Sequence, residues 1–209
     1  MSGLFITLEG GEGAGKSTQA VLLAEALLAR GRKVLRTREP GGSPGAETLR
    51  TLLLEGNHAL GLRAEVMVHF ASRLDHVENT IRPALDAGMV VVCDRFYDST
   101  LAYQGYGLGQ GDPGCLSFID RLIGLVGLAP DLTLLLDLPR DLALARLRQR
   151  GTRSDRYERL DEAFHQRVAG GFHEIARQAG TRVVTIPATG STQQVHEVML
   201  HEVEQRLPA

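Results

Sequence analysis

Residues 10–17 read Gly-Gly-Glu-Gly-Ala-Gly-Lys-Ser and follow directly on an apolar run at 4–8. This spacing matches the phosphate-binding loop that joins a strand to a helix. The glycines let backbone N–H groups point at phosphate oxygens, Lys16 adds a positive charge, and the Ser17 hydroxyl suits Mg²⁺. A flexible glycine-rich turn is the alternative, but one of the chain's two lysines stands on the motif's lysine position.

Arginine side chains supply a second set of candidate anion ligands. Arg95 follows Asp94 at the end of the apolar run 89–93, and Arg73 lies on a predicted long helix. A planar guanidinium group meets a phosphate or a base edge with two hydrogen bonds. The Asn-Lys-x-Asp motif of GTP switches is missing, since Lys33 is the only other lysine. Two facing phosphate sites indicate phosphoryl transfer from ATP to a small phosphorylated acceptor.

Five more arginines cluster around a predicted turn between two helices. They are Arg146, Arg148, Arg150, Arg153 and Arg156. Such a cluster fits a lid that closes over the transferred phosphoryl group and excludes water. The acidic residues at 155–162 leave open a second interpretation, a solvated charged face with ion pairs four residues apart.

Three acidic residues stand at the ends of predicted strands. Asp94 and Asp137 compete for the role of holding Mg²⁺ through water, and we favour Asp94 because residue 95 must already lie in the site. Asp137 would then cap the helix that follows it. Glu9 either accepts the acceptor's sugar hydroxyl or a metal-bound water, or satisfies loop amides as a buried acid. Ser17 and Asp94 are therefore the expected metal ligands.

The elements that must position these side chains alternate along the chain. Apolar runs predict strands at 4–8, 33–37, 89–93, 132–136 and 183–186. Helical spacing predicts helices at 17–30, 46–55, 62–87 with a kink at Pro83, 98–104, 113–127, 139–150, 157–179 and 191–206, with a glycine-rich loop at 105–111. This alternation predicts a three-layer αβα sandwich with a five-stranded parallel sheet, whose ligands bind beyond the carboxyl ends of the strands. We expect one domain over 1–209, with the lid at about 146–158.

Composition excludes several classes of partner. The net charge of −2 gives no general attraction to nucleic acid, and no apolar run approaches the ~20 residues that span a membrane. Cys93 and Cys115 have no metal-binding or redox spacing, which fits reduced thiols in a cytoplasmic protein.

Three further motifs give the chain a resemblance to a known family. Residues 37–44 read Thr-Arg-Glu-Pro-Gly-Gly-Ser-Pro, residues 94–104 read Asp-Arg-Phe-Tyr-Asp-Ser-Thr-Leu-Ala-Tyr-Gln, and residues 154–158 read Ser-Asp-Arg-Tyr-Glu. They resemble the R-E-P-G-G loop, the D-R-[YFH]-x-x-S-x-x-A-Y-Q signature and the lid D-R-x-E segment of the thymidylate kinase (dTMP kinase) family. The resemblance covers the whole chain and implies a P-loop nucleoside monophosphate kinase fold. It implies transfer of the γ-phosphoryl group of ATP to dTMP, giving dTDP and ADP in dTTP synthesis, with Mg²⁺ as cofactor and a homodimer as the assembly.

The resemblance also assigns roles to individual residues. By it, Arg95 holds the acceptor phosphate, Arg73 reads the thymine edge, and Thr100 and Gln104 lie beside the base. Tyr103 packs under the deoxyribose, where a ribose hydroxyl would clash. The full set of expected acceptor-binding residues is Glu9, Arg38, Glu39, Phe70, Arg73, Arg95, Ser99, Thr100, Tyr103 and Gln104.

Glu12 occupies the loop position where one branch of the family has a catalytic arginine. The chain therefore resembles the bacterial branch, in which lid arginines take over that function. Expected catalytic residues are Lys16, Arg95, Arg148, Arg150, Arg153 and Arg156, and expected ATP-binding residues are Gly10, Gly11, Glu12, Gly13, Ala14, Gly15, Lys16, Ser17 and Thr18.

Two features of the acceptor site stay open. The family's aromatic ring that stacks on thymine usually stands four residues before the helix arginine, where this chain has His69, while Phe70 stands three before it. Either residue could supply the face. The loop after the second strand could be a mere turn, but its constrained residues favour a site loop in which Glu39 steadies Arg38.

Other functions are compatible with a phosphate loop. A kinase for AMP, CMP, UMP or dGMP would use the same architecture. A non-catalytic nucleotide-binding module would be expected to lack Lys16 or the lid arginines, and a DNA-linked ATPase would need a basic, aromatic surface. The sequence favours the dTMP kinase.

Overall fold

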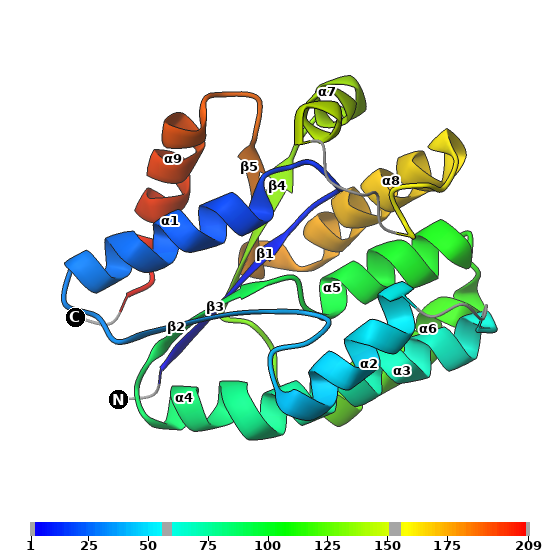
Figure 1. The fold of residues 1–209 in the computed structure, drawn as a ribbon, viewed down its shortest axis with the longest axis horizontal. Helices are drawn as coiled ribbons and strands as arrows, with labels where there is room; N and C mark the ends of the chain where they lie inside the picture. The colour runs from blue at the N-terminus through cyan, green and yellow to red at the C-terminus, as the bar shows by residue number, and fades with distance from the viewer. Residues whose placement is uncertain (1–2, 56–59, 151–155, 208–209) are drawn as a thin grey trace.

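The structure is a computed structural model that describes residues 3–55, 60–150 and 156–207. A five-stranded parallel sheet runs through its centre in the order β2-β3-β1-β4-β5 (Figure 1). The strands are β1 Leu4–Glu9, β2 Val34–Arg38, β3 Val90–Asp94, β4 Leu132–Asp137 and β5 Val183–Pro187. The predicted fold class and strands are thus confirmed. Because all five strands are parallel, their carboxyl ends meet at one edge of the sheet.

Helices cover both faces of this sheet. They are α1 Lys16–Ala29, α2 Pro44–Glu55, α3 Leu62–His76, α4 Arg82–Asp86, α5 Tyr97–Thr100, α6 Pro113–Val126, α7 Arg140–Arg150, α8 Glu162–Gln178 and α9 Thr192–Glu204, with π-helical segments η1 Val77–Ile81 and η2 Leu101–Leu108 and a 3₁₀ turn η3 Gly180–Arg182. Helices α1 and α9 lie on one face, α3, α6 and α8 lie on the other, and α2 packs outside α3 (Figure 1). In the described parts of the chain, no helix combines the length and apolar character needed to cross a membrane.

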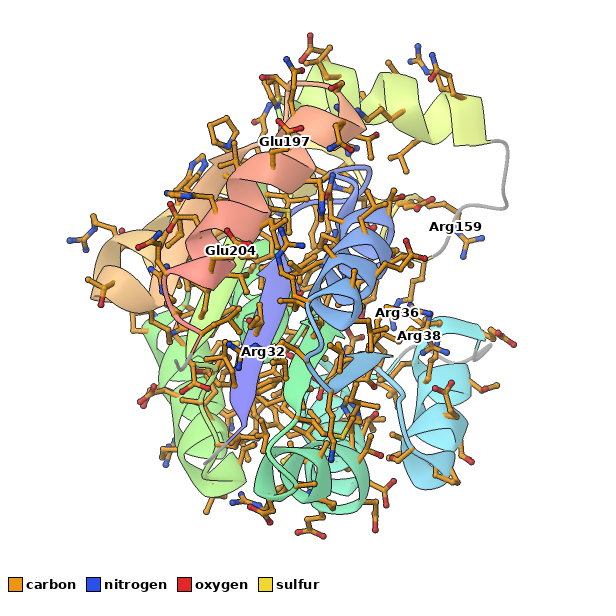
Figure 2. All side chains as sticks on the ribbon, turned by 90° about the vertical axis from the view of Figure 1, so that its left-hand side faces the viewer. Arg32, Arg36, Arg38, Arg159, Glu197 and Glu204 are labelled. Carbon is orange, nitrogen blue, oxygen red and sulfur yellow. The ribbon has the colours of Figure 1, made fainter. Side chains whose placement is uncertain are left out.

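The core has one part on each face of the sheet. Ile6 and Leu8 of β1 pack toward α1 and α9, whereas Phe5 of the same strand packs toward α3 and α6. The ring centroids of Phe5 and Phe96 lie 5.0 Å apart, nearly perpendicular. Side chains fill the space between the sheet and its helices (Figure 2). This two-sided burial explains why the central strands are continuous apolar runs.

The predicted long helix is interrupted where Pro83 disturbs it. Helix α3 continues through the π-helical turn η1 into α4, which has Pro83 in its first turn. Proline has no N–H, and its ring collides with the carbonyl group of the residue four positions earlier, here Asn79. The widened turn contains that residue, so the expected disturbance is present as a π-helical turn.

The glycine-rich loop predicted at 105–111 begins later than expected, because residues 101–108 continue α5 as helix and only residues 109–112 are non-helical. A Cβ atom on Gly107 would lie 2.5 Å from the Phe164 ring, and one on Gly105 would lie 2.7 Å from Leu116. Gly105 and Gly107 therefore allow close contact with α6 and α8, while Gly109 and Gly111 lie in the turn that follows the helix. Helix α8 also begins later than predicted, after Asp161, whose side chain accepts a hydrogen bond from the Phe164 N–H.

Candidate active site

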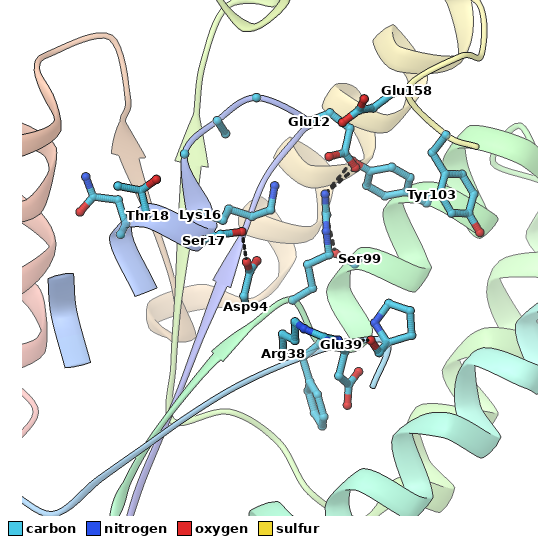
Figure 3. A pocket seen from close by; sticks show the side chains of 18 of the residues that line it. Glu12, Lys16, Ser17, Thr18, Arg38, Glu39, Asp94, Ser99, Tyr103 and Glu158 are labelled. Atoms are coloured by element: carbon cyan, nitrogen blue, oxygen red, sulfur yellow. Dashed lines mark hydrogen bonds and ion pairs between the residues drawn. The ribbon is translucent and has the colours of Figure 1, made fainter. Parts of the chain in front are cut away.

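A cavity of about 670 Å³ opens at the carboxyl edge of the sheet (Figure 3). The loop between β1 and α1 forms one wall, with φ angles of 136° at Gly10 and 79° at Gly13. A Cβ atom on Gly13 would lie 2.7 Å from the Ala143 carbonyl oxygen, so a larger residue would push α7 off the loop. The Lys16 ammonium group donates to the carbonyl oxygens of Gly10 and Gly11 at 3.0 and 2.8 Å. Burial, helped by the charge of Arg95, lowers the pKa of Lys16 to about 8.

Ser17 and Asp94 meet beside this loop. The Ser17 hydroxyl donates to Asp94 Oδ2 at 2.5 Å, while Asp94 Oδ1 is buried without a partner among the described residues (Figure 3). A hydroxyl and a carboxylate are hard oxygen ligands, so this pair fits Mg²⁺. Asp137 points elsewhere, since its Oδ1 lies 3.2 Å from His173 Nε2 near the surface. In residues 3–55, 60–150 and 156–207, no cluster of three or more His, Cys, Asp or Glu could bind a metal by itself.

Arg95 faces the phosphate loop across the cavity. Its backbone has a φ angle of 73°, a left-handed conformation that is strained for a non-glycine residue and is enriched at functional sites. The guanidinium group donates to Glu12 at 2.6 Å, to the Ser99 hydroxyl at 3.0 Å, and to the Tyr103 hydroxyl and the Gly10 carbonyl at 3.2 Å. A single arginine therefore connects the donor loop to the helix that follows β3.

Glu9 lies beneath Arg95 and is fully buried. Its Oε1 accepts hydrogen bonds from the backbone N–H groups of Phe96 and Ser99, and its Oε2 accepts from the Ser99 hydroxyl at 2.5 Å. Burial, followed by the nearby charge of Asp98, raises the pKa of Glu9 to about 7. Of the two roles considered for Glu9, these contacts match the second, a buried acid that accepts hydrogen bonds from backbone amides, here those at the start of α5.

Arg73 contributes to the far wall of the cavity. It is 3% exposed, with Nε donating to Glu39 at 2.8 Å and Nη2 donating to the Thr100 hydroxyl at 3.1 Å. Its Nη1 is buried and has no partner in the part of the chain that the structure describes. A buried donor without a partner is costly, so an acceptor on a bound molecule would satisfy it.

The predicted contact between Glu39 and Arg38 was wrong. Glu39 holds Arg73 and, at 3.1 Å, His76. Arg38 pairs instead with Glu47 at 3.2 Å and donates to the Pro40 carbonyl at 3.1 Å. Neighbouring residues of an extended strand point to opposite sides, so Glu39 turns inward to α3 while Arg38 stays exposed.

His69, and not Phe70, contributes to the cavity wall. Phe70 belongs to the core, and the Arg73 guanidinium carbon lies 4.7 Å from its ring centroid. The expectation that Phe70 contacts the acceptor is therefore corrected. One residue turns a helix by about 100°, which separates these neighbours. His69 Nε2 lies 3.2 Å from the Tyr157 hydroxyl. Burial, then the charge of Arg73, lowers the pKa of His69 to about 3, which keeps the ring neutral.

The helix after β3 supplies the remaining predicted residues. Ser99, Thr100, Tyr103 and Gln104 all line the cavity. The Tyr103 hydroxyl donates to Glu12 at 2.9 Å, and the Arg95 guanidinium carbon lies 5.0 Å from the centroid of the Tyr103 ring. The motif at 94–104 thus forms one continuous wall between the phosphate loop and Arg73.

The predicted lid arginines take different positions. Arg148 is exposed on α7, and Arg156 pairs with Glu65 at 2.7 Å. Arg150 ends α7 with a side chain that is not described, and Arg153 lies outside the described residues. Arg146, which was not among the predicted catalytic residues, lines the cavity and donates to the Ala188 carbonyl at 2.8 Å.

Helical periodicity could have singled out Arg146. Ala143 and Leu147 of α7 both approach Gly13 of the phosphate loop. Residues three and four positions apart share a face of a helix, so Arg146 lies on that face as well. Other cavity residues that had no role assigned from the sequence include Gln19, Arg50, Tyr157 and Glu158.

Comparisons with known proteins agree with this geometry. A family model for thymidylate kinase matches residues 8–199. The chain is 58% identical to the thymidylate kinase of Gluconobacter oxydans over 205 residues, which cover 98% of this chain and 96% of that protein. It is 53% identical to that of Rhizorhabdus wittichii over the full length of both. The crystal structure of thymidylate kinase from Ehrlichia chaffeensis superposes with a TM-score of 0.77 at 34% identity, covering 97% of this chain and 100% of that chain.

Proposed function

The chain belongs to the thymidylate kinase family, and from this we infer that it is a kinase that transfers the γ-phosphoryl group of ATP to dTMP. The products are dTDP and ADP, and dTDP serves dTTP synthesis. One observation carries the assignment of the site: the phosphate loop and Arg95 line the same cavity, so two phosphate groups can meet there. Within this function, the roles of single residues, the metal and the assembly are our proposals.

The donor side is formed by the phosphate loop. Backbone N–H groups of residues 10–18 and the positive end of α1 bind the phosphates of ATP, and Lys16 leaves the Gly10 and Gly11 carbonyls to contact the terminal phosphates. Ser17 and Asp94 would hold Mg²⁺, which neutralises phosphate charge when it is bound. Asp94 Oδ1, which is buried and has no partner among the described residues, supports this assignment.

The acceptor side is formed by α3 and by the helix after β3. Arg95 and Arg38 bind the phosphate of dTMP. Arg73 Nη1, which has no partner within the described ranges, donates to the thymine edge. Tyr103 packs under the deoxyribose, where it excludes a ribose hydroxyl. Thr100 and Gln104 lie beside the base. Glu39 orients Arg73, and Ser99, held by Glu9, orients Arg95.

The neutral ring of His69 supplies the face for the base. His69 lies on the cavity wall at the position four residues before Arg73. A buried uncharged imidazole can pack against a pyrimidine without the cost of burying a charge. Phe70, which we expected as the alternative, supports Arg73 from the core.

The reaction does not need a strong general base. A phosphate oxygen of dTMP is already an anion at neutral pH, so it can attack the γ-phosphorus of ATP directly. The protein must align two polyanions and neutralise their repulsion, which Lys16 and Arg95 do from opposite walls. We propose that Arg146, together with the lid arginines Arg148, Arg150, Arg153 and Arg156, adds positive charge and excludes water when the lid at about 146–158 closes.

We also propose a single kinase domain over 1–209 that forms a homodimer in the cytoplasm. Apolar side chains on two neighbouring helices support the dimer, because Met67 of α3 is 50% exposed and Leu125 of α6 is 74% exposed. The two described cysteines are buried free thiols, which fits a reducing compartment.

Steady-state assays with ATP and each nucleoside monophosphate test the function. We expect kcat/KM to be highest with dTMP, and a faster rate with UMP would contradict the assignment. Lys16→Ala should lower turnover by ~100-fold or more, since it removes a charge that acts on the transition state. Circular dichroism must show that the variant is folded, and near-normal turnover would then refute the role of Lys16.

A further inference from the structure

A buried group of polar side chains lies behind the wall that would contact the acceptor base. We call Glu65, His69, Gln104 and Tyr157 the Glu65 cluster. Glu65 Oε1 accepts from Tyr157 at 2.9 Å and from Gln104 Nε2 at 3.0 Å, and Tyr157 lies 3.0 Å from Gln104 and 3.2 Å from His69. All four side chains are at most 8% exposed. The other oxygen of Glu65 pairs with Arg156 at 2.7 Å.

Glu65 sets the direction of every hydrogen bond in the cluster. A carboxylate can only accept, so the Tyr157 hydroxyl must donate to it. The Tyr157 oxygen is then left to accept from Gln104 Nε2 and from His69 Nε2. The amide of Gln104 must therefore turn its nitrogen toward Glu65, because the reversed orientation would place two acceptor oxygens against each other.

This orientation decides what Gln104 presents to the cavity. Glu65 lies behind the wall, whereas His69, Gln104 and Tyr157 line it. With the amide nitrogen directed at Glu65, the carbonyl oxygen of Gln104 is left for the cavity. Thr100 stands four residues before Gln104, on the same side of the helix, and accepts from Arg73. An acceptor and a donor, Gln104 Oε1 and Arg73 Nη1, thus belong to the same wall.

These two groups match one pyrimidine better than the other. Thymine presents an N–H donor at position 3 beside a carbonyl acceptor at position 4. Cytosine presents an acceptor at position 3 and an amino donor at position 4. Its N3 acceptor would face the carbonyl oxygen of Gln104, and its amino donor would face the N–H of Arg73, so neither pair could form a hydrogen bond. A site built to hydrogen-bond one pattern rejects the other, because buried polar groups are left unpaired.

We propose that Glu65 is a positioning residue that makes the site select thymine over cytosine, by fixing the amide of Gln104 with its oxygen toward the base. The inference rests on the proposed function, since it requires the acceptor base to lie against this wall. Glu65 itself touches no substrate. It acts through Gln104 and, by way of Tyr157, through His69.

Glu65→Gln tests the proposal with little change in shape. The new amide can donate to the Gln104 carbonyl, so Gln104 can reverse and present its NH₂ group to the N3 acceptor of cytosine. We expect the ratio of kcat/KM for dTMP to that for dCMP to fall by ~10-fold or more, with dCMP turnover rising. An unchanged ratio in a folded variant would overturn the proposal. Wild-type protein is assayed first, since its failure to phosphorylate dTMP would instead refute the proposed function.

Two matched variants separate base selection from general damage. Tyr157→Phe removes a hydroxyl but leaves the bond between Glu65 and Gln104, so the dTMP to dCMP ratio should change by less than ~3-fold even if both rates fall. Arg156→Gln breaks the ion pair and keeps the carboxylate, and a loss of selectivity here equal to that of Glu65→Gln would assign the effect to the lid and overturn the proposal.

Should Glu65→Gln not fold, Gln104→Met removes the same carbonyl oxygen, and an unchanged ratio in that variant would overturn the proposal too.

Discussion

At the scale of single residues, the site depends on a few side chains that each form hydrogen bonds with several partners. Arg95 is the clearest case, because one guanidinium group bonds to Glu12, Ser99, Tyr103 and the Gly10 carbonyl. Its left-handed backbone conformation is held by the carboxylate of Glu9, which binds the amides of the next turn. A change in Glu9, Ser99 or Tyr103 should therefore alter the acceptor side before it alters the phosphate loop.

Tyr103 tests the exclusion of ribose. Tyr103→Ala should raise kcat/KM for UMP relative to dTMP by ~10-fold, because it opens the space that a 2′-hydroxyl needs. Tyr103→Phe keeps the ring and loses only the hydroxyl bonds to Glu12 and Arg95, so its UMP to dTMP ratio should stay near that of wild type. If Tyr103→Ala leaves the ratio unchanged in parallel assays, the ring does not act as the gate.

Glu9 gives a pH dependence of stability with a defined sign. Its pKa is about 7 in the fold and about 4.5 when unfolded, so between these values the folded protein holds a proton that the unfolded chain has lost. The free energy of unfolding should therefore fall as pH rises from 4.5 through 7, by on the order of 3 kcal/mol. Glu9→Gln has no such titration. In urea unfolding, the free energy of unfolding of the variant minus that of wild type should therefore increase from pH 5 to pH 8. Parallel profiles for the two proteins would refute this.

At the scale of elements, close helix packing brings the acceptor wall into place. The helical segment η2 carries Tyr103 and Gln104 and packs against α8 through small residues. Gly107 faces Phe164, and Gly171 of α8 faces Tyr106 of η2. Each glycine thus leaves room for an aromatic side chain of the other helix, which lets η2 and α8 pack closely.

Adjacent glycines in α8 offer a matched test of this packing. A Cβ atom on Gly171 would lie 2.7 Å from the Tyr106 Cβ, whereas one on Gly170 would meet nothing within 4 Å. Gly171→Ala should lower the free energy of unfolding by ~1–3 kcal/mol through overpacking. Gly170→Ala should raise it by ~0.5–1 kcal/mol, since alanine favours the helix. Equal effects of the two changes in denaturant unfolding would contradict the packing argument.

At the scale of the whole molecule, the donor and acceptor walls come from separate parts of the sequence and meet at one edge of the sheet. The central strand β1 leads into the phosphate loop, its neighbour β3 leads into Asp94 and Arg95, and its other neighbour β4 leads toward α7 and Arg146. Binding at the cavity should therefore stabilise the entire fold, because the ligands bind the folded state alone.

Thermal unfolding tests this coupling. At ~100 times its Kd, dTMP should add ~2.7 kcal/mol to the free energy of unfolding and raise Tm by ~5–10 °C, and a non-hydrolysable ATP analogue should add a further increase. Lys16→Ala should lose most of the increase from the ATP analogue and keep that from dTMP, because Lys16 lies on the donor wall. Loss of both increases would mean that the two subsites are not separate.

The sequence by itself determined the parts of this protein that depend on local geometry. The phosphate loop, the strands, the helix disturbance near Pro83 and the cavity position of the motif at 94–104 follow from residue spacing along the backbone. The family motifs also identified the reaction, because they describe groups that one short segment brings together.

Only the tertiary structure decided which distant side chains meet. Glu39 holds Arg73 and not Arg38, His69 replaces Phe70 at the cavity, and Gly107 packs against a helix that begins more than fifty residues later. Glu65 gave no signal in the sequence, since its bonds to Gln104 and Tyr157 join three separate segments. The physical reason is that strand and helix periodicity fixes the face on which a side chain lies, while its partner depends on how the elements pack.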